Sequence, residues 1–181
     1  MKFRPHIPLV LLLLGVTSGW GRAADTVVIP VGEYTPLIRS QEEPKVREVP
    51  AFRLDVHPVT NAEFLDFVTR NPQWRRSQVD ALFADELYLA HWADDLEPGP
   101  NAPLNAPVLQ ISWFAVRAFA AERGGRIPSI AEWERVASVG IEMESSRRDP
   151  IFAQRMSAWF SRPTEEMMPD VMADAPNLGG A

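Results

Sequence analysis

The sequence contains no cysteine among its 181 residues. The chain therefore forms no disulfide bonds, and it has no thiolate with which to attack a substrate or hold a soft metal ion. It also lacks the cysteine through which a lipoprotein is attached to its membrane. The folded domain must consequently be held together by packing alone.

The N-terminal apolar run, residues 7–16, is too short to span a bilayer. Basic residues precede it, and Gly21-Arg22-Ala23 offers small residues at both positions of a cleavage site. This pattern predicts a signal peptide over residues 1–23 and one mature domain over residues 24–181; an uncleaved anchor is the alternative. We expect an exported protein, periplasmic or secreted, that leaves the membrane after cleavage.

Basic residues are few, with 18 lysines and arginines against 24 acidic residues and a net charge of −6. Removal of the predicted signal takes away Lys2, Arg4 and Arg22, which leaves 15 basic residues and a net charge of −9. No basic patch remains to release counterions from a phosphate backbone. This balance excludes nucleic acid as an expected partner.

The middle of the chain predicts two consecutive helices. Ser112 is a good N-cap and Gly124 a good left-handed exit, which predicts a helix over residues 112–123. Its many apolar residues leave almost no polar side, so we expect it to be buried on most of its circumference. Ser129 and Glu132 form a capping box for the second helix, so Glu132 is interpreted as a cap partner rather than a catalytic acid. The apolar arc of this helix contains Ile130, Trp133, Val136 and Ala137.

An earlier helix is predicted over residues 60–70, because Thr60 and Glu63 form a second capping box. Two strands are predicted before it, over residues 25–31 and 49–56, with a turn-rich segment over residues 32–44 between them. A further short helix capped by Ser77 is predicted in the long segment that follows.

Two blocks of sequence resemble one known family. The first is Phe52-Arg-Leu-Asp followed by Pro58-Val-Thr-Asn-Ala-Glu-Phe-Leu-Asp-Phe. The second is Asn105-Ala-Pro-Val-Leu-Gln-Ile-Ser-Trp-Phe-Ala with Gly125-Arg-Ile-Pro-Ser-Ile-Ala-Glu-Trp-Glu-Arg-Val-Ala. Both resemble the sulfatase-modifying-factor family, which includes the formylglycine-generating enzymes. The resemblance covers residues 28–140 and implies an α+β fold like the N-terminal portion of that C-type-lectin-like architecture.

The resemblance also implies cofactors that this sequence does not match. Formylglycine formation in the family depends on a pair of cysteines that bind copper(I), and the family carries calcium-ligating loops beside Trp-Glu-Trp and Gly-Gly-Ser-Trp blocks. None of these blocks and no cysteine occurs in the 181 residues, so we expect neither cofactor here. The ergothioneine-type sulfoxide synthases of the family take iron ligands from a separate helical domain, for which this sequence has no room.

The segment between the two blocks, residues 71–107, offers a candidate surface for binding a partner protein. Aromatic and arginine residues often anchor interfaces, and the candidates are Trp74, Arg75, Arg76, Tyr88, His91 and Trp92. The alternative is that the aromatic residues pack this long segment against the core. His57 and His91 lack a third ligand at suitable spacing, which argues against a metal site.

Two functions follow as expectations. The first is an exported, non-catalytic module of the family that binds or assists another exported protein or peptide. The second is an oxidase of the formylglycine-generating type that acts on a protein or peptide substrate, which requires the C-terminal half of the family domain. The sequence itself supplies no catalytic residue for the second.

Overall fold

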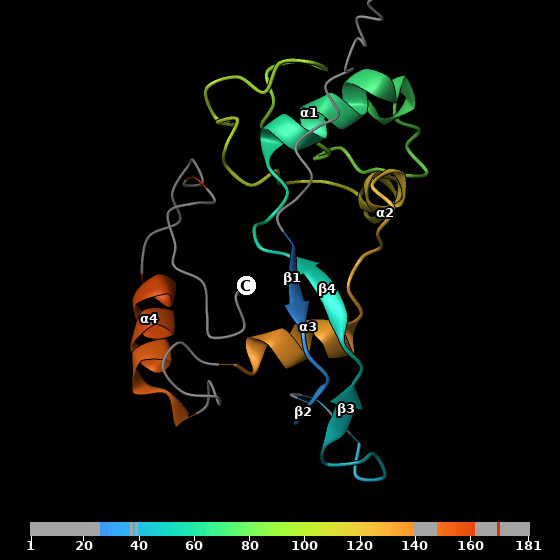
Figure 1. The fold of residues 1–181 in the computed structure, drawn as a ribbon. Coiled ribbons are helices and arrows are strands. Elements are labelled where there is room, and N and C mark those ends of the chain that lie inside the picture. The colour runs from blue at the N-terminus through green and yellow to red at the C-terminus, as the bar shows by residue number, and fades with distance from the viewer. Residues whose placement is uncertain (1–25, 37, 39, 140–147, 162–169, 171–181) are drawn as a thin grey trace, which may run out of the picture.

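The computed structural model describes residues 26–36, 38, 40–139, 148–161 and 170. Within them, short antiparallel strands precede four α-helices, so the predicted mixture of helices and strands is confirmed (Figure 1). None of the described helices combines the length and the apolar character needed to cross a membrane. The predicted signal peptide lies outside the described residues.

The strands form two short antiparallel pairs. β1 (Thr26–Ile29) pairs with β4 (Phe52–Asp55), and β2 (Gly32–Tyr34) pairs with β3 (Arg47–Val49). Prolines at positions 30 and 50 separate the pairs, because a proline has no N–H to donate to a ladder. The single strand predicted over residues 49–56 is therefore two strands, and the segment predicted as turns contains β2.

Helix α1 (Asn61–Arg70) begins where the capping box predicts. The Thr60 hydroxyl accepts a hydrogen bond from the Glu63 N–H, and the Glu63 carboxylate accepts one from the Thr60 N–H. The helix buries Phe64, Phe67 and Val68, each no more than 2% exposed. Its apolar stripe thus faces the core, as its sequence predicts.

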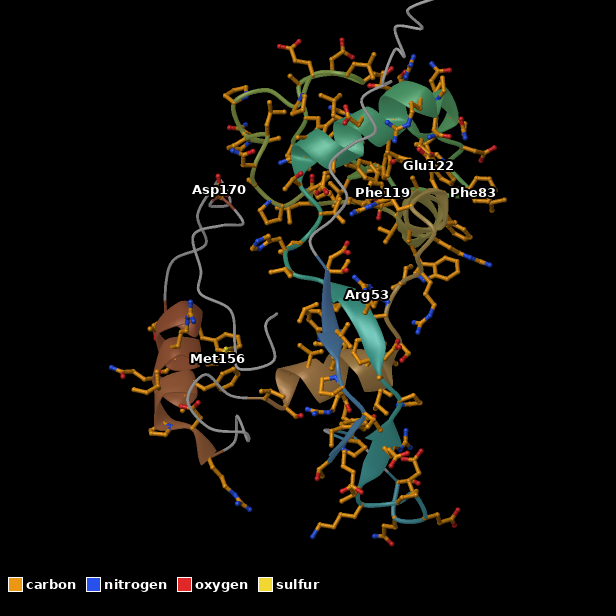
Figure 2. All side chains as sticks on the ribbon, viewed as in Figure 1. Arg53, Phe83, Phe119, Glu122, Met156 and Asp170 are labelled. Carbon is orange, nitrogen blue, oxygen red and sulfur yellow. The ribbon has the colours of Figure 1, made fainter. Side chains whose placement is uncertain are left out.

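Aromatic rings from three segments meet in this core. The ring of Phe64 lies 5.3 Å from that of Phe67, 5.8 Å from that of Phe119 and 6.3 Å from that of Trp92, measured between centroids. Figure 2 shows Phe119 between α1 and α2. These spacings suit tilted and edge-on aromatic packing, which adds to the burial of apolar area. The core therefore joins α1, α2 and the segment between them.

The long segment of residues 71–107 folds back onto the start of α1 (Figure 1). The N–H groups of Asn61 and Ala62 donate to the carbonyls of Ala106 and Leu104 at 3.0 and 2.9 Å. These are donors that the first turn of a helix leaves without internal partners. The segment begins with a short 3₁₀ helix, η1 (Pro72–Trp74). No helix follows Ser77, because its N–H and hydroxyl both bind the Asp95 carboxylate; that prediction was wrong.

The side chain of Asn61 ties the same segment to the core. Asn61 is 1% exposed, and its amide Nδ2 donates to the carbonyls of Pro103 at 2.9 Å and Ala106 at 3.2 Å. Its Oδ1 accepts from the indole Nε1 of Trp92 at 2.9 Å. Every polar group of this buried amide therefore contributes to the fold, since a buried polar group without a partner is costly.

Helix α2 (Trp113–Glu122) has the predicted bounds and cap. The Ser112 hydroxyl accepts from the Ala115 N–H, and Gly124 has the left-handed φ of 73° that ends the helix. The predicted burial of most of its circumference is wrong, however. Ala115 and Phe119 are buried, whereas Trp113 is 57% exposed and Phe114 43%.

Helix α3 (Ile130–Ala137) packs against β2 and β3. Its capping box is present, but three residues of its apolar arc, Ile130, Trp133 and Ala137, are exposed. Ile130 is 80% exposed and Trp133 is 64% exposed, while Glu132 is buried. The guanidinium of Arg135 lies so close to Gly32 in β2 that a Cβ there would collide with it. The guanidinium of Arg135 therefore contributes to the contact of α3 with β2.

Helix α4 (Pro150–Phe160), which the sequence did not predict, follows the gap in the described residues. The Asp149 carboxylate accepts hydrogen bonds from the N–H groups of Ile151 and Phe152, which is how an aspartate caps the N-terminus of a helix. Figure 1 shows α4 apart from the other helices.

Candidate functional site

The predicted partner-binding surface does not form as proposed. Tyr88 and Trp92 are each 2% exposed and belong to the core, so they cannot line a surface. The phenol of Tyr88 donates to the Trp74 carbonyl at 2.9 Å, and burial raises its pKa. The alternative, in which aromatic residues pack the segment onto the core, is confirmed for Tyr88 and Trp92.

The other candidates lie at the margin of that core. Arg75 donates to the carbonyls of Val68 and Thr69, both at 3.2 Å, and Arg76 donates to the Trp92 carbonyl at 2.9 Å. Both guanidinium groups therefore hold the backbone in place.

His91 is half-buried, and its Nδ1 lies 3.2 Å from Oε1 of Gln110. Its Nε2 is buried without a hydrogen-bond partner among the described residues, and burial lowers the pKa of the ring. The imidazole therefore contributes to the junction between residues 71–107 and the start of α2 in its neutral form.

A row of four aromatic side chains, three of them exposed and one half-buried, lies across α2 and the preceding segment. We call it the aromatic face, and it consists of Trp74, Phe83, Phe114 and Trp113. Successive ring centroids are 6.3, 5.1 and 5.3 Å apart, all with edge-on geometry. Phe83 is 39% exposed, and the exposure rises along the row to 57% at Trp113. Of these residues, only Trp74 was predicted from the sequence to be part of a surface.

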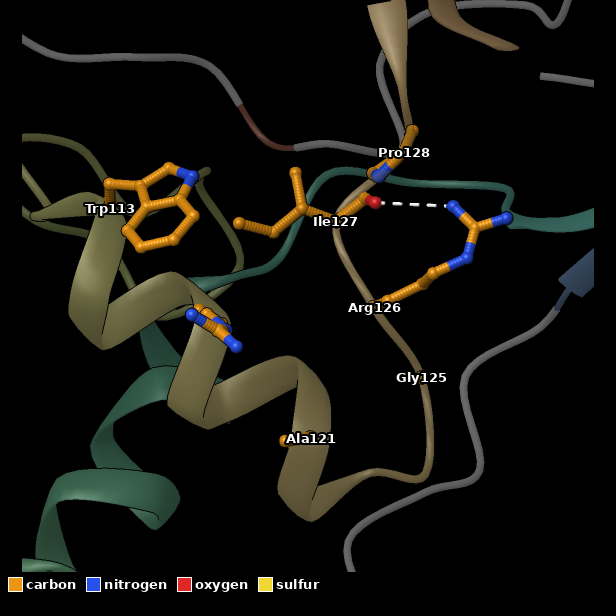
Figure 3. Close-up of a pocket in the computed structure, with 7 residues that line it drawn as sticks. Trp113, Ala121, Gly125, Arg126, Ile127 and Pro128 are labelled. Carbon is orange, nitrogen blue, oxygen red and sulfur yellow. Dashed lines mark hydrogen bonds between the residues drawn. The ribbon is translucent and has the colours of Figure 1, made fainter.

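A pocket of about 380 Å³ lies beside Trp113, between α2 and the segment that leads to α3 (Figure 3). Its helical wall consists of Trp113, Arg117 and Ala121, which share one face because they are four residues apart. Its other wall consists of residues 125–128, and Figure 3 shows the side chain of Ile127 pointing toward Trp113. The guanidinium carbon of Arg117 lies 5.3 Å from the centre of the Trp113 ring, a cation–π distance.

Arg126 lines the same pocket, but its guanidinium is engaged elsewhere. It donates two hydrogen bonds to the Glu132 carboxylate, at 2.7 and 2.6 Å, and one to the Ile127 carbonyl at 3.3 Å. The Arg126 guanidinium, together with the Ser129 N–H and hydroxyl, lowers the pKa of Glu132 to about 2. This confirms Glu132 as a cap partner, and a carboxylate so strongly paired is a poor general acid or base near neutral pH.

The pocket has the composition of a binding site without a reactive group. Its seven lining residues are Trp113, Arg117, Ala121, Gly125, Arg126, Ile127 and Pro128. Their side chains carry no carboxylate, imidazole, hydroxyl or thiol, so none of them can act as a nucleophile or as a general base near neutral pH. The arrangement can recognise a ligand through apolar area and one positive charge.

The residues present do not fit the copper(I) site that the family resemblance implies. That site needs thiolate donors, and the sequence contains no cysteine. Within the described part of the chain, no three histidine, aspartate or glutamate side chains come together as a possible metal site.

Comparison with known proteins establishes the family. Residues 17–165 match the sulfatase-modifying factor enzyme 1-like domain. The chain belongs to this family. It is 30% identical over 177 residues to inactive C-alpha-formylglycine-generating enzyme 2 of Bos taurus, and this match covers 78% of the chain. It is 31% identical over 117 residues to hercynine oxygenase of Mycobacterium tuberculosis, and 29% identical over 163 residues to formylglycine-generating enzyme of Mus musculus.

These matches cover only part of the relatives. The matched region spans 58% of the bovine protein, 28% of the mycobacterial protein and 44% of the mouse protein. The match to the mycobacterial protein covers 58% of this chain, and the match to the mouse protein covers 71% of it. Shared ancestry therefore establishes the domain family, whereas the activities named for the relatives do not follow from it.

Proposed function

We propose that this chain is a non-catalytic module of the sulfatase-modifying factor family that binds another exported protein. The observation that carries the proposal is the aromatic face with its adjacent pocket, which exposes tryptophan, phenylalanine and arginine but no group able to perform chemistry. Tryptophan and arginine are among the residues that most often dominate the energy of protein interfaces. A relative named as inactive, at 30% identity, supports a non-catalytic role for such a domain.

The exported location is part of the proposal and rests on the pattern of residues 1–23. The C-type-lectin-like architecture implied by the family resemblance is likewise proposed as the scaffold on which the face is presented. Sequencing the N-terminus of the protein isolated from its source would test the location. A mature chain that begins at Ala24 is expected, and retention of residues 1–23 would contradict cleavage.

Photo-crosslinking tests the binding role. A p-benzoylphenylalanine in place of Phe114 would lie on the aromatic face, because Phe114 is 43% exposed. The same residue in place of Ile38, which is 91% exposed in a different part of the chain, provides a matched control. In cells of the source organism, we expect discrete products of higher mass from position 114 and not from position 38. No product from position 114, or the same products from both, would contradict the proposal.

The alternative is an oxidase of the formylglycine-generating type that acts on a protein or peptide, which the 29% identity to the mouse enzyme favours. These 181 residues supply no thiolate, so the alternative requires the reactive part to come from additional polypeptide. Incubation of the purified chain with copper(I), oxygen and a cysteine-containing peptide discriminates the two. Conversion of the peptide to an aldehyde, detected by mass spectrometry, would establish the alternative; an unchanged peptide is expected.

A further inference from the structure

Most arginines of the described residues 26–139 have an oxygen partner. Four bind carboxylates: Arg47, Arg70, Arg123 and Arg126. Arg53 binds the Thr26 hydroxyl, and Arg75 and Arg76 bind backbone carbonyls. Among the described residues between positions 26 and 139, which leave out Arg39, only Arg117 and Arg135 have neither an ion pair nor a side-chain hydrogen bond. Arg117 is exposed at the pocket, whereas Arg135 is half-buried between α3 and β2. Arg117 is therefore the guanidinium that a ligand could engage.

The position of Arg117 defines what it could bind. Its guanidinium is held over the Trp113 ring, and the apolar side chains of Ile127 and Pro128 lie on the opposite wall of the pocket. A guanidinium stacked on an aromatic ring keeps its donors directed outward, in a planar fork that matches a carboxylate. A ligand seated against the neighbouring apolar walls would displace water from one side of the guanidinium, which would strengthen a charged hydrogen bond formed there.

The charge of the pocket limits the ligand to one negative group. Arg126 is the second cation of the lining, and Glu132 neutralises it through two hydrogen bonds. The chain as a whole has a net charge of −6, so it repels strongly anionic partners elsewhere on its surface. These features favour a single carboxylate over a phosphate-rich ligand. A volume of about 380 Å³ has room for two or three side chains of a peptide.

We propose that the pocket binds a segment of a partner protein in which one aspartate or glutamate stands beside apolar residues. The carboxylate pairs with Arg117, and the apolar side chains fill the space between Trp113, Ile127 and Pro128. This inference rests on the proposed function and deepens it, because it specifies the chemistry of the partner segment. Charge complementarity carries it: the pocket supplies a positive charge and apolar walls, and the segment supplies their counterparts.

Peptide selection tests the inference with the full chain. A phage library of random twelve-residue peptides is panned on the wild-type protein, on Arg117→Gln and on the control Arg148→Gln. Arg148 is exposed and does not line the pocket, so it matches the charge change at a different place. We expect the wild type and the control to enrich peptides with an acidic residue next to leucine, phenylalanine or proline. Arg117→Gln should lose the acidic preference.

Affinity measurements on one selected peptide quantify the effect. By fluorescence polarisation we expect Arg117→Gln to weaken binding by about tenfold or more, and Arg117→Lys to weaken it less, because lysine keeps the charge but not the planar fork. A peptide with glutamine in place of its acidic residue should bind the wild type as weakly as the original peptide binds Arg117→Gln. Far-UV circular dichroism confirms that each variant is folded.

The outcomes that overturn the inference differ from those that overturn the proposed function. Enrichment of apolar peptides without acid, bound equally by Arg117→Gln, would refute the acidic preference while leaving a binding face. Absence of any enrichment would refute the peptide site, and crosslinking at position 114 would still decide the binding role. A dimer in light scattering that Trp113→Ala dissociates would assign the face to a second copy of this chain and refute the inference.

Discussion

Helices α1 and α3 begin in the same way. In each, a hydroxyl accepts from the N–H of the third helical residue, whose glutamate reaches back to the N–H of the cap: Thr60 with Glu63 in α1, and Ser129 with Glu132 in α3. Both helices also carry an apolar stripe at helical spacing. Their local sequences are therefore equally good descriptions of an amphipathic helix.

The two helices nevertheless turn opposite faces toward the rest of the chain. α1 buries Phe64 and Phe67, whereas α3 exposes Ile130 and Trp133 and buries Glu132. The glutamate of α3 is held by Arg126, a residue outside the helix. Capping thus determines where a helix starts, while the partners available in space determine which face is covered. The exposed stripe of α3 and the aromatic face of α2 are alike in this respect, because no described residue covers either of them.

The first prediction concerns the apolar stripes. Phe64→Ala removes a ring that packs against three others, so we expect the free energy of unfolding to fall by about 3–5 kcal/mol. Trp133→Ala removes a ring that is 64% exposed, and we expect a change within about 0.5 kcal/mol. Urea unfolding followed by circular dichroism measures both. A large loss for Trp133→Ala would show that the outer face of α3 is covered in the folded protein.

The second prediction concerns the buried amide on which α1 depends. Asn61→Ala leaves the Trp92 indole N–H and the Pro103 carbonyl without their partner, so we expect a loss of about 2–4 kcal/mol. Asn101→Ala, at an exposed position in the same segment, should be nearly neutral. Hydrogen exchange of the Trp92 indole by NMR should accelerate in the first variant. Unchanged exchange together with unchanged stability would contradict the role of Asn61.

How far the sequence predicts this fold depends on where the partners of each residue lie. The start of α1 and its inward face follow from eleven adjacent residues, because Thr60, Glu63 and the apolar stripe are all local. The role of Asn61 does not, since its partners are the backbone of residues 103–106 and the indole of Trp92. The outward face of α3 likewise depends on contacts of Glu132 and Arg135 beyond the helix.

The candidate site shows the same limit. A capped helix over residues 112–123 was predictable, and its run of apolar residues suggested burial on every side. Only one side is covered, by Phe64 and Phe67 against Phe119, which leaves Trp113 and Phe114 exposed. A signal was present, since Arg117 follows Trp113 by four residues and so marks that side of the helix as polar. Whether this polar side forms a pocket depends on residues 125–128 opposite it, and no local sequence pattern predicts where those residues lie.

The third prediction uses pH to separate the two capping boxes. The pKa of Glu132 is about 2 in the folded chain against an ordinary value of 4.5, so its contribution to stability is complete above pH 4.5 and is lost as the pH falls toward 2. We expect a loss of about 1–2 kcal/mol over this window, below the full value of the shift because Arg126 is two-thirds exposed.

Urea unfolding at several pH values measures this loss. Glu132→Gln should flatten the dependence. Glu134→Gln, which changes a glutamate of the same helix without a side-chain hydrogen bond or ion pair among the described residues, should leave it in place. An equal slope in wild type and Glu132→Gln would contradict the pairing.

The smallest effect is expected at the junction between residues 71–107 and α2. Burial lowers the pKa of His91 below its ordinary value of 6.5, and its Nε2 has no acceptor among the described residues. The unfolded chain therefore takes up the proton first, so stability is highest above pH 6.5 and falls as the pH drops below it. His91→Gln, which cannot be protonated, should remove this slope between pH 7 and 5, whereas the same change at His57 should not. An NMR titration in which His91 protonates at or above its ordinary pKa would show that the ring is not buried. It would then contradict the packing of this junction.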